Sequence, residues 1–84
     1  MKYVIFKYRQ LLMPVIIPQH VTHSQVKIDD AFPVSAGFFK INRIGLCQVY
    51  GESESLKLKP AEGDEDLLNA VLNDSGTSAF LKFD

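Results

Sequence analysis

The chain has 84 residues, of which 46% are hydrophobic and 23% are charged, and its formal net charge is −1. These fractions are typical of a globular domain and exclude a collagen-like or an intrinsically disordered chain. A chain of this length is expected to form a single domain, residues 1–84. Its core is modest, and little length remains for a deep enzyme cleft.

The cysteine content and the N-terminal sequence bear on the compartment. Cys47 is the single cysteine, so no internal disulfide supports the fold, and a reducing compartment is favoured. The apolar residues 11–18 form a short stretch that contains two prolines and precedes no small-residue cleavage site. We therefore expect neither a secretory signal nor a membrane span, and a cytoplasmic protein.

Charge is unevenly distributed along the chain. Residues 1–43 carry six basic and two acidic side chains, whereas residues 44–84 carry three basic and eight acidic ones. Such an asymmetry can orient a partner or a second copy. The simpler interpretation is that the two halves attract each other within the fold.

The first expected elements are two strands. Residues 2–9 are rich in aromatic and β-branched side chains and carry apolar groups on both faces. Residues 12–17 predict a second strand. Pro14 within it cannot donate a ladder hydrogen bond, which indicates an edge strand or a bulge.

Residues 19–30 have an ambiguous pattern. Thr22 and Gln25 have the spacing of a capping box, which predicts a short helix. Val26 and Ile28 alternate with polar neighbours, which predicts a strand. A loop that leads into a short strand is favoured, and Pro33 is expected to close the segment.

Residues 34–41 and 44–50 predict a β-hairpin. Asn42 and Arg43 would form its two-residue turn. This turn pairs Phe39 with Leu46 and leaves both faces of the hairpin apolar.

The C-terminal half predicts one helix between two strands. Leu56 and Leu58 alternate with lysines, as in a short strand with one buried face. Residues 64–75 combine an acidic first turn with a single apolar stripe, which predicts a helix whose Leu68 and Val71 are buried against the sheet. Residues 79–83 predict a last strand. The expected fold is α+β, an antiparallel-rich β-sheet of four to six strands with this helix packed on one face.

One cluster has side chains suited to a metal. His20 and His23 lie three residues apart, and Asp29 or Asp30 follows as a carboxylate ligand for Zn²⁺. The spacing matches no established metal motif, so surface histidines are the simpler interpretation. No cofactor is expected.

Other reactive groups lack a catalytic context. No histidine base is indicated for Ser53, Ser55 or Ser78, and Cys47 lies among apolar residues, as a buried small hydrophobe does. Basic and aromatic residues alternate within residues 2–9, as in a single-strand stacking platform. The net charge of −1 and the pI near 6.1 argue against nucleic-acid binding.

Two hypotheses for function remain. The first is a small non-enzymatic interaction or accessory protein that self-associates and binds another macromolecule, an unidentified protein. Small size without a motif is typical of the accessory proteins of phages and other mobile elements. The second is a small metal- or ligand-binding protein that uses the His20, His23, Asp29 and Asp30 region.

The first hypothesis depends on an apolar sheet face that one narrow helix leaves uncovered. We expect a homodimer joined through this face. Its predicted contributors are Phe39, Ile41, Ile44, Leu46 and Tyr50. The competing arrangement is that residues 18–33 fold across the face and hide it within one chain.

Overall fold

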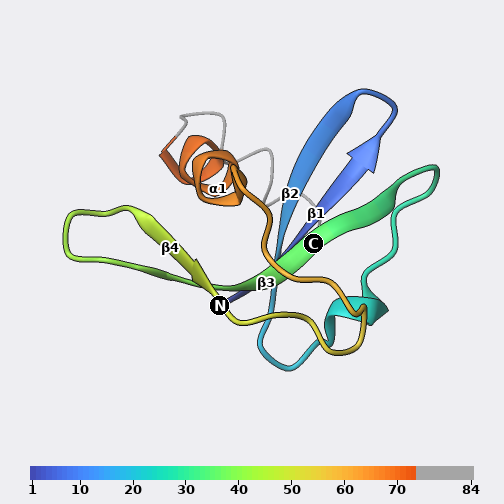
Figure 1. The fold of residues 1–84 in the computed structure, drawn as a ribbon, viewed down its shortest axis with the longest axis horizontal. Helices are drawn as coiled ribbons and strands as arrows, with labels where there is room; N and C mark the ends of the chain where they lie inside the picture. The colour runs from blue at the N-terminus through green and yellow to red at the C-terminus, as the bar shows by residue number, and fades with distance from the viewer. Residues whose placement is uncertain (74–84) are drawn as a thin grey trace.

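The computed structural model describes residues 1–73, which form an α+β fold of one antiparallel sheet and one helix (Figure 1). Within these residues the sheet has four strands in the order β2-β1-β3-β4. The elements are β1 (Lys2–Tyr8), β2 (Leu11–Ile17), β3 (Phe32–Ile41), β4 (Cys47–Tyr50) and α1 (Asp64–Asn73). The predicted strand at residues 79–83 lies outside the described residues.

The central strand β1 contributes to two cores because its successive side chains point to opposite faces of the sheet. Tyr3 and Ile5 face the helix, whereas Val4 and Phe6 face the loops on the other side, and all four are buried. The helix-side core also contains Phe39, Cys47 and Leu68. The loop-side core also contains Ile17 and Ala36.

The face away from the helix is covered within the chain, which corrects the premise of the predicted dimer. Val21, Val26 and Ile28 pack against the loop-side core, together with Leu56 and Leu58. The competing arrangement is therefore the observed one, with a second loop adding to the cover. These loops carry little regular structure, so their sequence pattern does not predict that they cover the face that the narrow helix leaves open.

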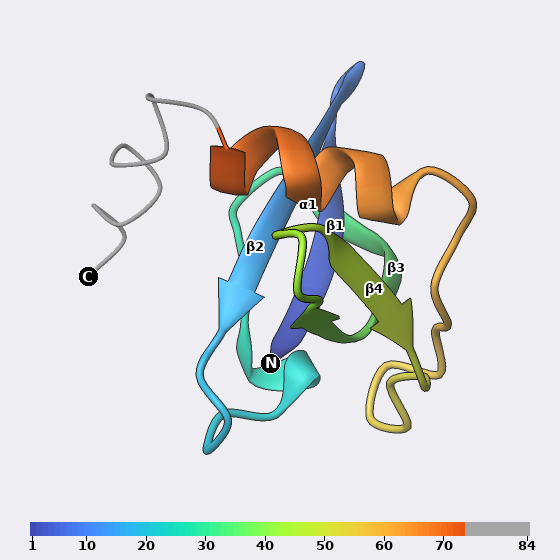
Figure 2. The same cartoon turned by 90° about the vertical axis from the view of Figure 1, so that its left-hand side faces the viewer.

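Helix α1 begins at the predicted residue and crosses the sheet (Figure 2). Leu68 is completely buried beneath it, and Leu67 and Leu72 pack against the same core. Val71, predicted to be as buried as Leu68, is only half-buried. The helix is described to Asn73, so its predicted end at residue 75 lies outside the described residues.

The β3–β4 hairpin exists, but its predicted register is wrong. Phe39 pairs with Val49 and not with Leu46. The loop has three residues, Arg43 to Gly45, and not the predicted two. Three-residue hairpin loops end with a residue in the left-handed region, and Gly45, with φ 88°, occupies that position. The register differs by an odd number of residues, so the side chains of β4 exchange faces relative to β3.

Two other predictions are corrected. Residues 19–30 contain one 3₁₀ turn, His23–Gln25, and no strand. The expected capping box of Thr22 and Gln25 is present, and within it the Thr22 N–H donates to Gln25 Oε1 at 2.7 Å. Leu58 forms only an isolated bridge to Ser53, because the left-handed Lys57, at φ 58°, turns the chain tightly between them.

Candidate functional site

The hairpin tip, residues 40–46, extends beyond the rest of the sheet. Met1 exchanges two backbone hydrogen bonds with Phe39, of 2.9 and 2.7 Å, and β1 starts there. Beyond Phe39, β4 is therefore the only strand among residues 1–73 that pairs with β3 (Figure 1). The tip carries three exposed aliphatic side chains, Ile41, Ile44 and Leu46, and Ile44 at its apex is 78% exposed.

The backbone of the hairpin tip is held by one side chain. Asn42 Oδ1 accepts hydrogen bonds from the N–H groups of Ile44 and Leu46, each at 3.0 Å. The Asn42 N–H donates to the Leu46 carbonyl, and the Gly45 N–H donates to the Asn42 carbonyl. Asparagine suits this position because its short amide reaches the backbone two residues further on. Ile44 is therefore presented to solvent by an ordered loop.

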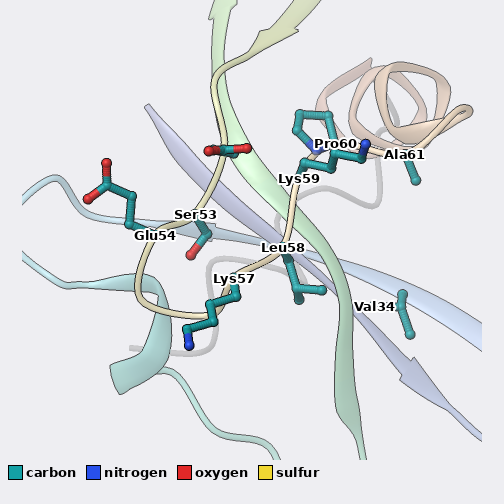
Figure 3. Close-up of a pocket in the computed structure, with 9 residues that line it drawn as sticks. Val34, Ser53, Glu54, Lys57, Leu58, Lys59, Pro60 and Ala61 are labelled. Carbon is teal, nitrogen blue, oxygen red and sulfur yellow. The ribbon is translucent and has the colours of Figure 1, made fainter.

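A groove of about 730 Å³ lies between the start of β3 and the loop that precedes α1 (Figure 3). Val34, Leu58 and Pro60 give it an apolar side, and Ala61 extends that side toward the helix. Its charged lining residues are Glu52, Glu54, Lys57 and Lys59. In the close-up, Val34 and Glu54 lie on opposite sides of the view, and the Glu54 side chain points away from Val34.

Two local irregularities form the groove. The pairing of β1 with β3 shifts between Ile5 and Phe6, which leaves Val34 as the extra residue of a β-bulge. Bulges redirect side chains, and Val34 is partly exposed here. Gly37 lets Pro60 approach β3, since a Cβ at Gly37 would lie 2.9 Å from Pro60 Cγ.

A buried carboxylate joins the helix to the sheet. Asp64 Oδ2 accepts from the Tyr3 hydroxyl at 2.7 Å and from the Ala61 N–H at 2.9 Å, and Oδ1 accepts from the Ser35 hydroxyl at 3.0 Å. Burial, followed by the hydrogen bond to Asp64, raises the pKa of the Tyr3 phenol far above its usual range. All three side chains are at most 2% exposed, so no substrate reaches them. The cluster is structural.

The predicted metal ligands are not brought together. His23 is buried, its Nε2 lies 2.9 Å from the Gly37 carbonyl oxygen, and its ring contacts Phe38 edge-on. His20 and Asp29 are exposed. Among residues 1–73, no three His, Cys, Asp or Glu side chains form a group that could hold a metal ion. The His23 ring is engaged with the Gly37 carbonyl of β3, so it attaches the loop to the sheet and does not face the exposed His20 and Asp29.

The other candidate reactive groups within the described residues are hydrogen-bonded to the backbone or buried in the core. Ser53 is buried and its hydroxyl accepts from the Leu56 N–H, while the exposed Ser55 accepts from the Ser24 N–H. Ser78 lies outside the described residues. Cys47 is buried in the helix-side core, and burial, with a smaller effect of the Glu65 charge, raises its pKa. A raised pKa and burial both suppress thiolate chemistry.

Both edges of the sheet resist pairing with another strand. On β4, the outward N–H groups of Cys47 and Val49 donate to Asn69 Oδ1 and Glu65 Oε2 of the helix, at 2.7 and 2.9 Å. On β2, Pro14 pairs with Ile5. Hydrogen-bonding groups alternate in direction along a strand, and Met1 bonds to Phe39 of β3, so the N–H and C=O of Ile5 also point toward β3 and away from Pro14. Pro14 therefore places its missing donor on the outer edge, a known protection against edge pairing.

The predicted interface residues do not share one face. Phe39 is completely buried in the helix-side core, where it contacts Tyr3 edge-on. Tyr50 is half exposed and stacks on Phe38, on the opposite side of the sheet. Ile41, Ile44 and Leu46 are exposed at the hairpin tip, where the pairing of Ile41 with Cys47 places Ile41 and Leu46 on opposite faces. Likewise, the burial of Tyr3 and Phe6 removes two aromatic rings from the supposed stacking platform in β1.

Sequence reasoning missed the groove and the Asp64 cluster. Asp64 reads as one of three acids in a first helical turn, and nothing in the sequence separates it from Asp66. The glycine three residues after Asn42 was a usable signal for the longer hairpin loop.

Within the described residues, no helix has the length and apolar character needed to cross a membrane. Comparison of the chain with protein-family models, with curated proteins and with solved structures gave no match.

Proposed function

We propose that the protein is a non-catalytic interaction module that self-associates and binds another macromolecule through its hairpin tip. The observation that carries this proposal is the ordered exposure of Ile44, which is 78% accessible on a loop held by Asn42. Binding energy in protein interfaces is concentrated in a few side chains that fill pockets on the partner. An apolar side chain held by an ordered loop loses little entropy when it binds.

The composition of the tip defines the partner surface that it fits. The tip contains two basic residues, Lys40 and Arg43, and no acidic one. Its exposed aliphatic side chains are Ile41, Ile44 and Leu46, and Ile44 at the apex is the most exposed. A complementary surface has an apolar depression with carboxylates at its rim.

The two edges of the sheet are protected against backbone pairing, so a partner is expected to contact side chains. Both sheet edges are protected, so backbone pairing with another strand is opposed at β2 and β4. The buried Tyr3, Ser35 and Asp64 are engaged with one another and lie beyond the reach of a substrate. These features support a binding role and leave the tip as the surface to test.

Sedimentation equilibrium at micromolar concentration tests the proposal. We expect the wild-type protein to show a weight-average mass above the 9.4 kDa of one chain. Ile44→Lys should return the mass to 9.4 kDa. Leu11→Lys is the matched control, because Leu11 is 62% exposed on the β1–β2 hairpin, away from the tip. A wild-type protein that remains at 9.4 kDa throughout would refute self-association.

A further inference from the structure

We infer that the hairpin tip of one copy docks into the groove of a second copy, so that the chains associate head to tail. This inference rests on the proposed function and specifies its partner surface. Each copy carries a convex apolar element, the tip, and a concave one, the groove of about 730 Å³. Pockets of this size accept several side chains.

A tip cannot occupy the groove of its own chain. Val34, on the apolar side of the groove, lies near the start of β3, and Ile41 ends the same strand. Seven residues of extended strand separate them, a distance of about 20 Å. Because β3 is a paired strand of the sheet, it cannot fold back on itself. The occupant must therefore come from another molecule.

The chemistry of the two surfaces is complementary. Ile44 of the tip meets the apolar side made by Val34, Leu58 and Pro60. Lys40 and Arg43 both precede Ile44 in the sequence, and Glu52 and Glu54 line the groove. Lys57 and Lys59 also line it, so the net charge of the lining is zero. The apolar contact therefore supplies the affinity, and the glutamates select the orientation in which the basic side chains face them.

A symmetric contact between two tips is less favourable on two grounds. It would bring the Lys40 and Arg43 side chains of both copies together without an acidic neighbour in either tip. It would also bury only the exposed parts of three aliphatic side chains from each copy, Ile41, Ile44 and Leu46. Insertion into a groove buries the sides of the loop as well as its apex.

The test uses two variants that each disable one surface. Ile44→Asp disables the tip, and Val34→Lys fills the groove and repels Arg43. Each variant alone should sediment as a single chain of 9.4 kDa. Their equimolar mixture should form a complex of twice that mass and nothing larger, because only one intact tip and one intact groove remain to meet. Circular dichroism at 222 nm checks that both variants keep the helix.

A charge exchange provides a second, independent measurement. Glu54→Lys should weaken wild-type association at least tenfold, and a mixture of Glu54→Lys with Arg43→Glu should regain most of it. Glu62→Lys is the matched control, because Glu62 is exposed in the same loop but does not line this groove.

The outcomes separate the two proposals. A monomeric wild-type protein refutes self-association and the head-to-tail contact together. A wild-type protein that associates, with a mixture of Ile44→Asp and Val34→Lys that stays monomeric, refutes only the tip-in-groove contact. Retained association of Val34→Lys alone would likewise exclude the groove.

Discussion

Replacement of Asp64 tests the buried cluster that attaches the helix to the sheet. Asp64→Ala removes the acceptor of two hydroxyl groups, those of Tyr3 and Ser35, which are almost fully buried. A buried polar group left without a partner costs about 1–3 kcal/mol. With the lost bond to the Ala61 N–H, we expect a destabilisation of about 3–5 kcal/mol. A chain of this size has about 4–12 kcal/mol in total.

Asp64→Asn separates the effect of charge from that of geometry. The amide oxygen can still accept from Tyr3 and from the Ala61 N–H, and the amide nitrogen can donate to the Ser35 hydroxyl, which rotates to accept. Only the charge assistance is lost, so we expect a cost of about 1–2 kcal/mol. Asp66→Asn is the control, because Asp66 is exposed in the same helical turn and should change stability by less than about 0.5 kcal/mol.

Urea unfolding followed by circular dichroism measures these differences. With a slope near 1 kcal/mol per molar urea, Asp64→Asn should lower the midpoint by about 1–2 M. The effects of Asp64→Ala and Tyr3→Phe should not add in the double variant, because both changes remove the same hydrogen bond. If Asp64→Ala unfolds at the same urea concentration as Asp66→Ala, the carboxylate is solvated and the described cluster is wrong.

Four further outcomes are expected. Leu68→Ala should cost about 2–5 kcal/mol in urea unfolding and Val71→Ala clearly less, since only Leu68 is fully buried; equal losses would mean a rotated helix. Gly37→Ala should destabilise by about 1–3 kcal/mol, because the new Cβ would lie 2.9 Å from Pro60 Cγ and 3.2 Å from the Tyr50 carbonyl oxygen; Pro60→Ala should relieve the part of that loss that comes from the proline ring. The Cys47 thiol should react with a disulfide reagent at pH 8 far more slowly in native protein than in urea, because burial both raises its pKa and shields it; equal rates would contradict this. The raised pKa of Tyr3 favours the native state while the unfolded phenol stays protonated, so unfolding free energy should fall as the pH rises above about 10, and less steeply in Tyr3→Phe.

The elements with a strong local pattern were predictable. The alternation in β1 and the apolar stripe of α1 depend on periodicities that every buried strand or helix must satisfy. Leu68 was identified as a core residue for that reason, and it is completely buried. The α+β class follows from these elements.

The hairpin register and the loop cover depended on interactions that periodicity does not encode. The register is decided by Asn42 and Gly45, which close a three-residue loop in place of the expected two-residue turn. That difference moved Phe39 and Tyr50 to opposite faces, so the predicted interface was assembled from two surfaces. The groove depends on a bulge at Val34 and on Pro60 reaching Gly37, contacts between distant parts of the sequence.

The loop cover explains why self-association should be sought at the tip. Long-range hydrogen bonds hold residues 18–31 over the sheet. Lys2 Nζ donates to the Val21 carbonyl, and His23 Nε2 bonds to the Gly37 carbonyl. These bonds let a segment with little regular structure exclude water from Val4 and Phe6. With that face closed and both edges protected, the exposed aliphatic side chains of the hairpin tip remain available to a partner, at the end of the sheet where β3 and β4 extend past β1. A dimer through the covered face would require His23 to leave Gly37, whereas a contact at Ile44 requires no rearrangement.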